Sequence, residues 1–359
     1  MTQCVILHEY GAPEHYRGLQ SLLAEAGENE PKFVEFGFIK LFIKGLLRGD
    51  SSRIRSAIRS AIWIILASFG VFRGQKIVLG VAPYDTRIVA LLPIIFFNRI
   101  YWHNSWPYWG TGREPKNSSS LVRWIWKNIF FKRIEHAFFV TEHAASNFRS
   151  VFGENFAIST VGHAFDVKVF HPCSVRTLLK DSIRVGYAGR LEKVKGIDSF
   201  IEVAHSLSCE WASFAVAGDG PMEMVVTKAA AQFPPRKFTH HGFLPHKALG
   251  KFFRDLDVLL LPSKTTPHWE EVFGMVIIEA MACGVVPLTT AHPGPVEILG
   301  ASHPEWLFDE SNFCADVVKS IVHYHNDRSL LERDRTAAIR MASGYSQERV
   351  RQRWTAFLD

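Results

Sequence analysis

The sequence predicts an α/β protein with two doubly wound, Rossmann-like lobes facing a cleft. At 359 residues the chain exceeds the usual size of one hydrophobic core, which favours two domains. Short apolar runs alternate with helical periodicity from end to end, the pattern of parallel sheets covered on both faces. The polar segment His171 to Ser182 separates two such sets and predicts a linker. We therefore expect lobes at residues 1–172 and 180–343, followed by a C-terminal helix within 344–359.

Each predicted strand is an apolar run followed by helical periodicity. In the first lobe we expect strands at Val5–Leu7, Phe33–Phe36, Ile77–Val81, Ile100–Trp102, Ala137–Val140 and Phe156–Val161. In the second lobe we expect them at Arg184–Tyr187, Phe214–Ala217, Phe238–His240, Val258–Leu261 and Val285–Thr289. The segment Ser346–Leu358 has apolar residues at helical spacing and predicts one amphipathic helix.

Composition excludes several classes of protein. With 47% hydrophobic and 21% charged residues and no low-complexity tract, the chain is neither disordered nor fibrous. The five cysteines are odd in number, scattered and never spaced as C-x-x-C, which argues against a disulfide framework or a zinc site and favours a reducing compartment. The first residues lack a basic stretch before a long apolar core, so we expect no secretory signal. The apolar run between Arg59 and Arg73 is too short to span a bilayer, so we expect no transmembrane helix.

Positive charge is concentrated in the first lobe. Residues 36–133 hold 16 Lys and Arg against three acidic residues, a surplus of +13, whereas the rest of the chain carries −7. Lys40, Lys44 and Arg48 repeat every four residues among apolar neighbours, which predicts an interfacial helix at an anionic membrane. The alternative is a helix packed on its own sheet with a solvated basic edge.

The segment Trp102 to Gly110 is dense in aromatic rings. Such rings could stack on an acceptor sugar or lie at the level of lipid headgroups. The alternative is that they fill the core.

Two cations follow the first strand of the second lobe. Arg190 and Lys195 lie in the segment Gly189 to Gly196, at the carboxyl edge of a parallel sheet, where ligands of such sheets bind. Together they suit a diphosphate, because Arg bonds it bidentately and Lys acts as a point charge. The tight turn Ala217-Gly218-Asp219-Gly220-Pro221 follows the next strand.

The pair Glu271 and Glu279 gives the sharpest signal. The two carboxylates bracket a predicted helix start at Phe273 or Gly274, where free backbone N–H groups favour an anion. Eight helical residues rise about 12 Å, which is roughly the separation of the sugar and the ribose in a nucleotide sugar. The alternative is an ordinary amphipathic helix.

In order and spacing, these motifs resemble the retaining GT-B glycosyltransferases of the group 1 family. The resemblance covers about Ile183 to Leu299 and rests on Gly189-Arg190-Leu191, Gly218-Asp219-Gly220-Pro221, Pro262-Ser263, Glu271 to Gly284 and Gly294-Pro295-Val296-Glu297. It implies metal-independent transfer of a sugar from a nucleotide-diphosphate sugar with retention of anomeric configuration, and no cofactor. It also implies that the last helix returns to pack on the first lobe.

The resemblance also implies roles for single residues. Arg190 and Lys195 would bind the diphosphate, Glu271 the donor sugar and Glu279 the ribose. Backbone groups of Phe273, Gly274 and Met275 would contact the sugar and phosphate. In the first lobe, Gly11 would belong to a glycine-rich loop near the donor phosphates, and His103 would face the donor sugar.

These observations predict a retaining hexosyltransferase that acts on a glycan or lipid-linked acceptor in cell-envelope polysaccharide or glycolipid synthesis. We expect it in the cytoplasm, peripheral on the inner face of the plasma membrane. Two alternatives remain, a nucleotide-sugar epimerase of the same fold and a non-catalytic carbohydrate- or lipid-binding module. A dehydrogenase is disfavoured because no strand precedes G-x-G-x-x-G, and nucleic-acid binding because no motif supports it.

Overall fold

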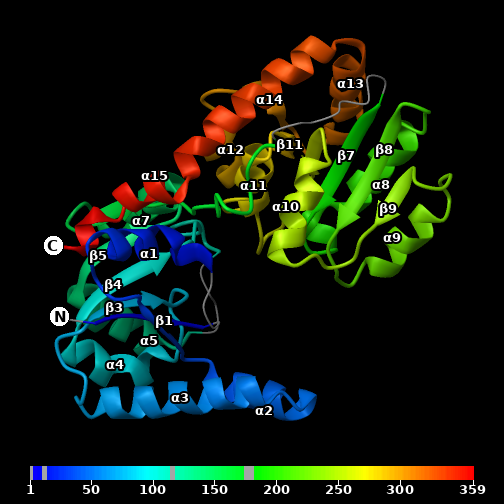
Figure 1. Ribbon diagram of the computed structural model, residues 1–359. Coiled ribbons are helices and arrows are strands. Elements are labelled where there is room, and N and C mark those ends of the chain that lie inside the picture. The colour runs from blue at the N-terminus through cyan, green and yellow to red at the C-terminus, as the bar shows by residue number, and fades with distance from the viewer. Residues whose placement is uncertain (1–2, 10–13, 114–117, 174–181) are drawn as a thin grey trace. The chain divides into compact units, whose positions relative to one another are not determined.

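The computed structural model describes residues 3–9, 14–113, 118–173 and 182–359 (Figure 1). The chain forms two compact units, Met1–Ala164 with Val350–Asp359, and Phe165–Arg349. The first boundary precedes the expected linker because Asp166 to Phe170 already pack in the second unit. There the Phe170 ring meets Phe253 at 6.0 Å, and the Val169 carbonyl accepts a hydrogen bond from Arg254.

The first unit is built on a six-stranded parallel sheet. Its strands, in the order β2-β1-β3-β4-β5-β6, are β1 (Cys4–His8), β2 (Lys32–Glu35), β3 (Lys76–Gly80), β4 (Arg99–Asn104), β5 (Ile134–Phe139) and β6 (Ile158–Thr160). Its main helices are α1 (Arg17–Glu25), α2 (Phe38–Arg48), α3 (Ser51–Ser68), α4 (Ile88–Phe97), α5 (Ser120–Ile125), α6 (Phe131–Arg133) and α7 (Glu142–Phe152), with a π-helical segment Trp126–Phe130. All six predicted strands are present.

Alternation along these strands separates two apolar cores. Val5, Leu7 and Leu79 face a core that includes residues of α3, α4, α5 and α7. Ile6 and Val78 face the opposite core, to which α1 and the C-terminal segment contribute. Figure 1 shows α1 and α4 on opposite faces of this sheet. The period of two that defines a strand thus produces both layers.

The C-terminal segment fills the second of these cores. Val350, Trp354 and Phe357 are buried there, and a side chain at Gly18 of α1 would collide with Val350. The expectation of one continuous helix over Ser346–Leu358 is wrong. α15 (Gln347–Gln352) ends early and a 3₁₀ helix (Thr355–Phe357) follows, after which Lys76 Nζ donates to the carbonyls of Phe357 and Leu358 at 2.7 and 2.8 Å.

The second unit holds another six-stranded parallel sheet. In the order β12-β11-β10-β7-β8-β9, its strands are β7 (Ile183–Ala188), β8 (Ala212–Ala217), β9 (Phe238–His240), β10 (Val258–Leu261), β11 (Val286–Thr290) and β12 (Leu307–Phe308). Its helices are α8 (Ile197–Ser206), α9 (Glu223–Ala230), α10 (His246–Arg254), α11 (Met275–Ala282), α12 (Pro293–Leu299), α13 (Phe313–Asn326) and α14 (Arg328–Ala342) (Figure 1). This is the Rossmann strand order, so the predicted doubly wound fold is confirmed.

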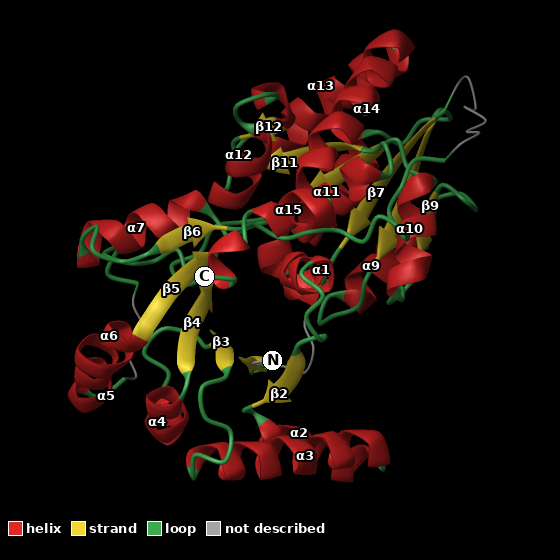
Figure 2. Ribbon diagram, turned by 60° about the vertical axis from the view of Figure 1, so that its left-hand side comes forward, coloured by secondary structure: helices red, strands yellow, loops and turns green. Residues whose placement is uncertain are grey.

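Helices α2 and α3 form a hairpin in which Gly45 packs on Ile54 (Figure 2). Only Gly45 of α2 is buried, so the alternative of a helix packed on the sheet is wrong for this element. Its apolar side chains face solvent, with exposed fractions of 65% for Ile39, 50% for Ile43 and 82% for Leu47. In the part of the chain that the structure describes, no helix combines the length and apolar character needed to cross a membrane.

Most rings of the aromatic segment Trp102 to Gly110, which begins within β4, fill the core. Trp102, Tyr108 and Trp109 are buried, and the ring of Trp102 lies within 6.0 Å of that of Trp109. Trp102 belongs to β4, a central strand whose side chains pack on both faces, and Tyr108 and Trp109 are buried residues of the loop after it. These three rings present no free surface to a sugar or lipid, whereas Trp106 is half-buried.

Candidate functional site

The second unit has one topological switch point, between β7 and β10. The chain leaves these neighbouring strands in opposite directions, so the loops after them, Gly189–Gly196 and Pro262–Gly274, meet at the carboxyl edge. The two loops touch closely. Lys264 N donates to the carbonyl of Val194 at 2.8 Å, and Gly196, at φ 68°, packs so tightly that a Cβ there would overlap the carbonyl of Pro262.

Lys195 and Glu271 meet at this edge. Lys195 Nζ donates to Glu271 Oε2 at 2.7 Å and lies 4.7 Å from the centre of the Trp269 ring. Glu271 is buried, whereas the Lys195 side chain is partly exposed. An ammonium has three donors, so Lys195 can bind a second anionic group while it holds Glu271. The structure thus brings together two of the residues singled out in the sequence.

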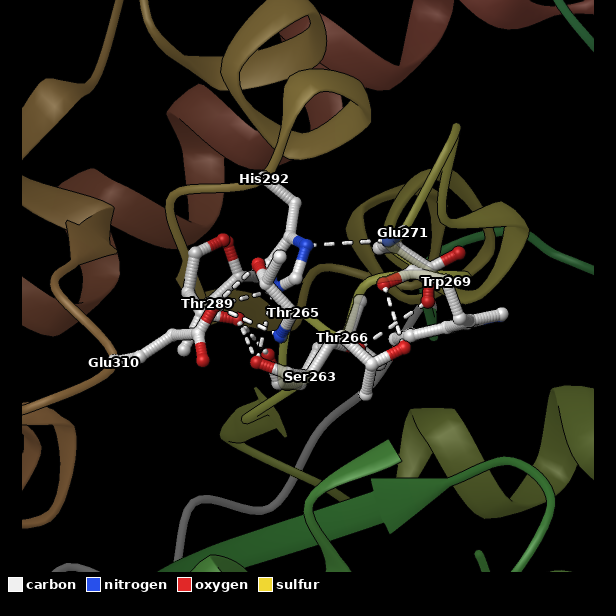
Figure 3. A network of polar contacts seen from close by, with 10 residues as sticks. Ser263, Thr265, Thr266, Trp269, Glu271, Thr289, His292 and Glu310 are labelled. Atoms are coloured by element: carbon white, nitrogen blue, oxygen red, sulfur yellow. Dashed lines mark hydrogen bonds and ion pairs between the residues drawn. The ribbon is translucent and has the colours of Figure 1, made fainter. Parts of the chain in front are cut away.

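Glu271 is fixed by a buried histidine that the sequence analysis did not identify (Figure 3). His292 Nδ1 accepts the backbone N–H of Glu271 at 3.1 Å, and its Nε2 lies 2.9 Å from the Ser263 carbonyl. This requires the neutral tautomer with the proton on Nε2. The Ser263 hydroxyl lies 3.3 Å from Glu271 Oε2. The loop is therefore tied to the end of β11.

Further polar contacts brace the same loop (Figure 3). The Thr290 hydroxyl donates to the Ser263 carbonyl at 2.8 Å, and the Thr265 N–H donates to Glu310 Oε1 at 2.9 Å. The Thr266 N–H donates to the Trp269 carbonyl at 2.8 Å. The side chains of Thr290 and Glu310, together with this backbone contact within the loop, thus restrain the loop that carries Glu271.

Helix α11 begins later than a helix spanning both glutamates would require. Gly274, at φ 85°, caps the helix and Met275 is its first residue, whereas Glu271 lies in the loop before it. The 12 Å estimate assumed helix throughout and therefore does not apply. Phe273 is buried, and the Gly294 N–H donates to the Glu271 carbonyl at 3.2 Å. Glu279 lies in the helix and is only 5% exposed.

The other described residues predicted from the sequence do not take part in the Lys195–Glu271 contact. The Arg190 side chain is 71% exposed, and its guanidinium pairs with Glu192 at 2.6 Å rather than with Glu271. Gly218 follows β8 at φ 146°, where a Cβ would overlap the carbonyl of Gly189. Gly11, predicted in the first lobe, lies outside the described residues.

His103 belongs to a cluster of rings in the first unit. It is the penultimate residue of β4 and lies close to Tyr16, Trp354 and His163, with ring centres at 4.8, 5.6 and 6.1 Å. Burial, and then the neighbouring His15 and His8, hold the pKa of His103 well below its usual range, so the imidazole is neutral. Among the described residues its buried Nε2 has no hydrogen-bond partner. The described residues contain no group of three or more His, Cys, Asp or Glu that could hold a metal ion.

These histidines predict a loss of stability in mild acid. Burial lowers the pKa of both His103 and His163 in the folded protein. As the pH falls through about 6.5, the unfolded chain takes up protons that the folded chain does not, so folding stability decreases. We expect a lower urea midpoint for the first unit at pH 5.5 than at pH 7.5, with a smaller difference in His103→Asn. An imidazole titration showing His103 protonated above pH 6.5 would contradict this.

A separate cavity of about 610 Å³ opens beside β8 and β9. Its lining includes Trp211, Arg236 and Lys251 but none of the predicted donor-binding residues. It begins at the amino ends of the strands, whereas ligands of doubly wound sheets bind at the carboxyl ends. The topology therefore favours the Lys195 and Glu271 site.

Sequence reasoning missed His292 and Trp269 in the second unit and His8 and His15 in the first. One signal was available for His292, since it follows the predicted strand Val285–Thr289 by three residues and must lie at the same sheet edge. Trp269 had no such signal because it lies in an irregular loop whose path depends on tertiary contacts.

The second unit is similar to known proteins. The model of the family described as "Glycosyl transferases group 1" matches residues 175–340. A 2-deoxystreptamine N-acetyl-D-glucosaminyltransferase of Streptomyces fradiae is 34% identical over 137 residues, 36% of this chain and 31% of that protein. The amylovoran biosynthesis glycosyltransferase AmsK of Erwinia amylovora is 26% identical over 142 residues, 38% and 35% of the two chains. The matched segments thus span about a third of these relatives.

Solved structures resemble the whole chain. The Anabaena protein HepE, solved with UDP and glucose, has a TM-score of 0.68 at 14% identity and covers 100% of this chain and 99% of its own. Sucrose-phosphate synthase of Thermosynechococcus elongatus has a TM-score of 0.65 at 14% identity, covering 98% and 96%. At this identity the likeness shows the fold. The chain therefore has the GT-B fold, and its residues 175–340 match the model of the group 1 family of glycosyl transferases.

Proposed function

We propose that this protein is a retaining, metal-independent glycosyltransferase that moves a sugar from a nucleotide-diphosphate sugar to a glycan or lipid-linked acceptor. The observation that carries the proposal is the Lys195–Glu271 pair at the switch point of a Rossmann-ordered sheet, inside the segment that matches the group 1 family. Relatives named for amylovoran and aminoglycoside glycosyl transfer support a role in polysaccharide or glycoside synthesis.

In this proposal the chemistry is stabilisation of the leaving group. Cleavage of the bond between sugar and diphosphate builds negative charge, which Lys195 and Arg190 neutralise together with backbone N–H groups at Phe273, Gly274 and Met275. Glu271, held by His292, accepts hydrogen bonds from the donor sugar. The acceptor attacks on the face that the diphosphate leaves, which retains the anomeric configuration.

A panel of nucleotide sugars tests the proposal directly. A bound donor raises the unfolding temperature by mass action, so the cognate nucleotide sugar should protect the protein most. Nucleotide release assayed with and without acceptor then separates a transferase from an epimerase and from a binding module. Activity should survive EDTA, and strict dependence on a divalent ion would overturn metal independence.

Glu279→Gln should weaken binding of the nucleoside diphosphate about 10-fold or more. In this proposal the buried carboxylate accepts hydrogen bonds from the ribose, and hydrogen bonds to charged groups contribute about 1.5 to 3 kcal/mol. Calorimetry with the free nucleoside diphosphate measures the change. The isosteric substitution preserves the packing of α11. If a folded variant kept the native affinity for the nucleoside diphosphate, Glu279 would not bind the ribose.

We further propose that the protein works peripherally on the inner face of the plasma membrane, through the α2–α3 hairpin. Exposed apolar side chains of α2, Ile39, Ile43 and Leu47, alternate with the exposed cations Lys40, Lys44 and Arg48. Such a helix buries its apolar side chains at the lipid boundary, and each nearby cation adds about 1 kcal/mol of attraction to anionic lipid. This would present the acceptor side to a lipid-linked or envelope glycan.

Binding to anionic vesicles should fall with rising salt and in the triple variant Lys40→Gln, Lys44→Gln, Arg48→Gln. Exposed charges are screened over about 8 Å at physiological ionic strength, so the bound fraction should decrease steeply above it. Vesicle cosedimentation measures this. The control removes three exposed cations of the second unit, Lys228, Lys247 and Lys319, and should bind as the native protein does. If the two variants lost vesicle binding equally, the α2–α3 hairpin would not be the membrane-binding element.

A further inference from the structure

A second polar cavity, of about 480 Å³, lies in the first unit between α3 and the edge strand β2. Figure 2 shows the α2–α3 hairpin beneath this strand. The lining consists of three basic residues, three serines and two apolar residues: Lys32, Arg55, Arg59, Ser52, Ser56, Ser60, Phe33 and Val34. No acidic side chain is among them. The cavity is therefore rich in hydrogen-bond donors and carries a local charge of about +3.

No ion pair of the described structure neutralises the three cations, although Lys32 Nζ lies 5.9 and 6.0 Å from the centres of the Trp63 and Phe72 rings. Arg53, their neighbour, pairs with Asp50 at 3.1 Å, but in the described part of the chain Lys32, Arg55 and Arg59 form no ion pair. Arg55 and Arg59 are four residues apart on one helix, a spacing at which like charges repel. An uncompensated cluster of this kind favours binding of an anion, which would relieve the repulsion.

The hydroxyl groups of the lining suit an oxyanion. Ser52, Ser56 and Ser60 recur every four residues and so follow one side of α3. Ser60 is buried, and its oxygen accepts the Glu35 N–H at 3.2 Å, which leaves its hydroxyl hydrogen to be donated. Arg guanidinium groups bind phosphate oxygens bidentately, and serine hydroxyls bind the remaining ones.

The arrangement around α3 connects this cavity to the apolar surface of the hairpin. At about 100° per residue, Arg55 and Arg59 fall between the serines and the exposed residues Ile58, Ile62 and Ile65. These three isoleucines are 45%, 52% and 55% exposed. A group whose apolar tail lay along the isoleucines would bring a phosphate to the two arginines.

We propose that this cavity is a phosphate-binding site that takes a phosphomonoester, with the headgroup of an anionic lipid as its source. The site adds to the proposed glycosyl transfer and does not depend on it, because none of its residues is among the donor-binding residues. The same chemistry would bind a free phosphate compound, and the two sources are distinguished by the form in which the ligand is offered.

The test compares vesicles and soluble ligands without any sugar donor. Vesicles containing phosphatidic acid, a phosphomonoester, are compared with vesicles of equal surface charge containing phosphatidylglycerol, and calorimetry measures binding of glycerol 3-phosphate and inorganic phosphate. We expect at least a 10-fold preference for phosphatidic acid. If the protein binds the soluble phosphates but shows no preference between the vesicles, the cavity is a phosphate site whose ligand is a free phosphate compound, and the lipid source is wrong. If the protein shows no preference for phosphatidic acid and does not bind the soluble phosphates, the proposal is overturned.

Matched variants separate the site from general electrostatics. Arg55→Gln with Arg59→Gln, and the charge-neutral pair Ser52→Ala with Ser56→Ala, should each abolish the preference for the phosphomonoester. Lys44→Gln with Arg48→Gln removes the same charge from α2 outside the cavity, and should weaken binding to both kinds of vesicle equally while the preference persists. If the control pair also abolishes the preference, or if the serine pair leaves it intact, the cavity is not the site. These outcomes do not depend on whether glycosyl transfer is detected.

Discussion

Lys195→Ala is expected to lower turnover by about 100-fold or more in a protein that still folds. The ammonium lies 2.7 Å from Glu271 at the edge where the leaving diphosphate would develop charge. Removing one preorganised donor to a developing charge typically costs about 2.7 to 4 kcal/mol, which is 10²- to 10³-fold in rate. Steady-state kinetics with the cognate donor measure the effect, with kcat and KM determined separately.

Lys193→Ala is the matched control, because Lys193 lies in the same 3₁₀ turn, is exposed and forms no ion pair in the described structure. It should retain near-native turnover. If Lys195→Ala raised KM and left kcat unchanged, Lys195 would bind the donor equally in the ground and transition states, and its proposed role in stabilising the leaving group would be wrong.

Gly196→Ala should destabilise the second unit by about 2 to 5 kcal/mol. Gly196 has φ 68°, which costs a residue with a side chain about 1 to 2 kcal/mol, and its Cβ would overlap the carbonyl of Pro262. Relieving that overlap must separate the loops after β7 and β10, at an additional cost of about 1 to 3 kcal/mol. Unfolding temperature should fall by roughly 10 °C, at about 2–4 °C per kcal/mol.

Gly242→Ala isolates the contribution of the overlap. Gly242 has almost the same backbone conformation, φ 63°, but nothing lies within 4 Å of its added Cβ. Its substitution should therefore cost only the backbone strain. Similar losses at both glycines would show that the close contact between the two loops does not restrain the site.

Most of the sheet could be predicted because its strands are continuous apolar runs. Val258–Leu261 and Phe238–His240 match the observed bounds of β10 and β9. The two residues of β12 were missed because Leu307–Phe308 is too short to show a period. The candidate site was predictable where motif residues follow strands directly, as Lys195 does. It was not predictable where tertiary contacts create the geometry, as in the hydrogen bond from Glu271 to His292 across 21 residues of sequence.

The helical repeat of cations predicted α2, whereas for the aromatic segment Trp102 to Gly110 the sequence left two interpretations open, and core filling holds for Trp102, Tyr108 and Trp109. The first segment combines apolar residues with cations and the second combines aromatic residues with polar ones. Composition alone does not distinguish an exposed surface from a core. The difference is topological. Trp102 lies on the central strand β4 and packs with Trp109 in the core, whereas α2 contacts its neighbour α3 through the small residue Gly45 and leaves its apolar residues exposed.

The division of the first unit into Met1–Ala164 and Val350–Asp359 bears on how the chain folds during synthesis. The ribosome adds the 185 residues of Phe165–Arg349 before Trp354 emerges. At about 5–20 residues per second this takes on the order of 10 to 40 s. Throughout that interval, nascent Tyr16, Tyr101 and Phe138 lack the rings of Trp354 and Phe357 that cover them in the finished protein. The second unit can thus complete its core before the first, reversing the N-to-C order in which nascent domains generally mature.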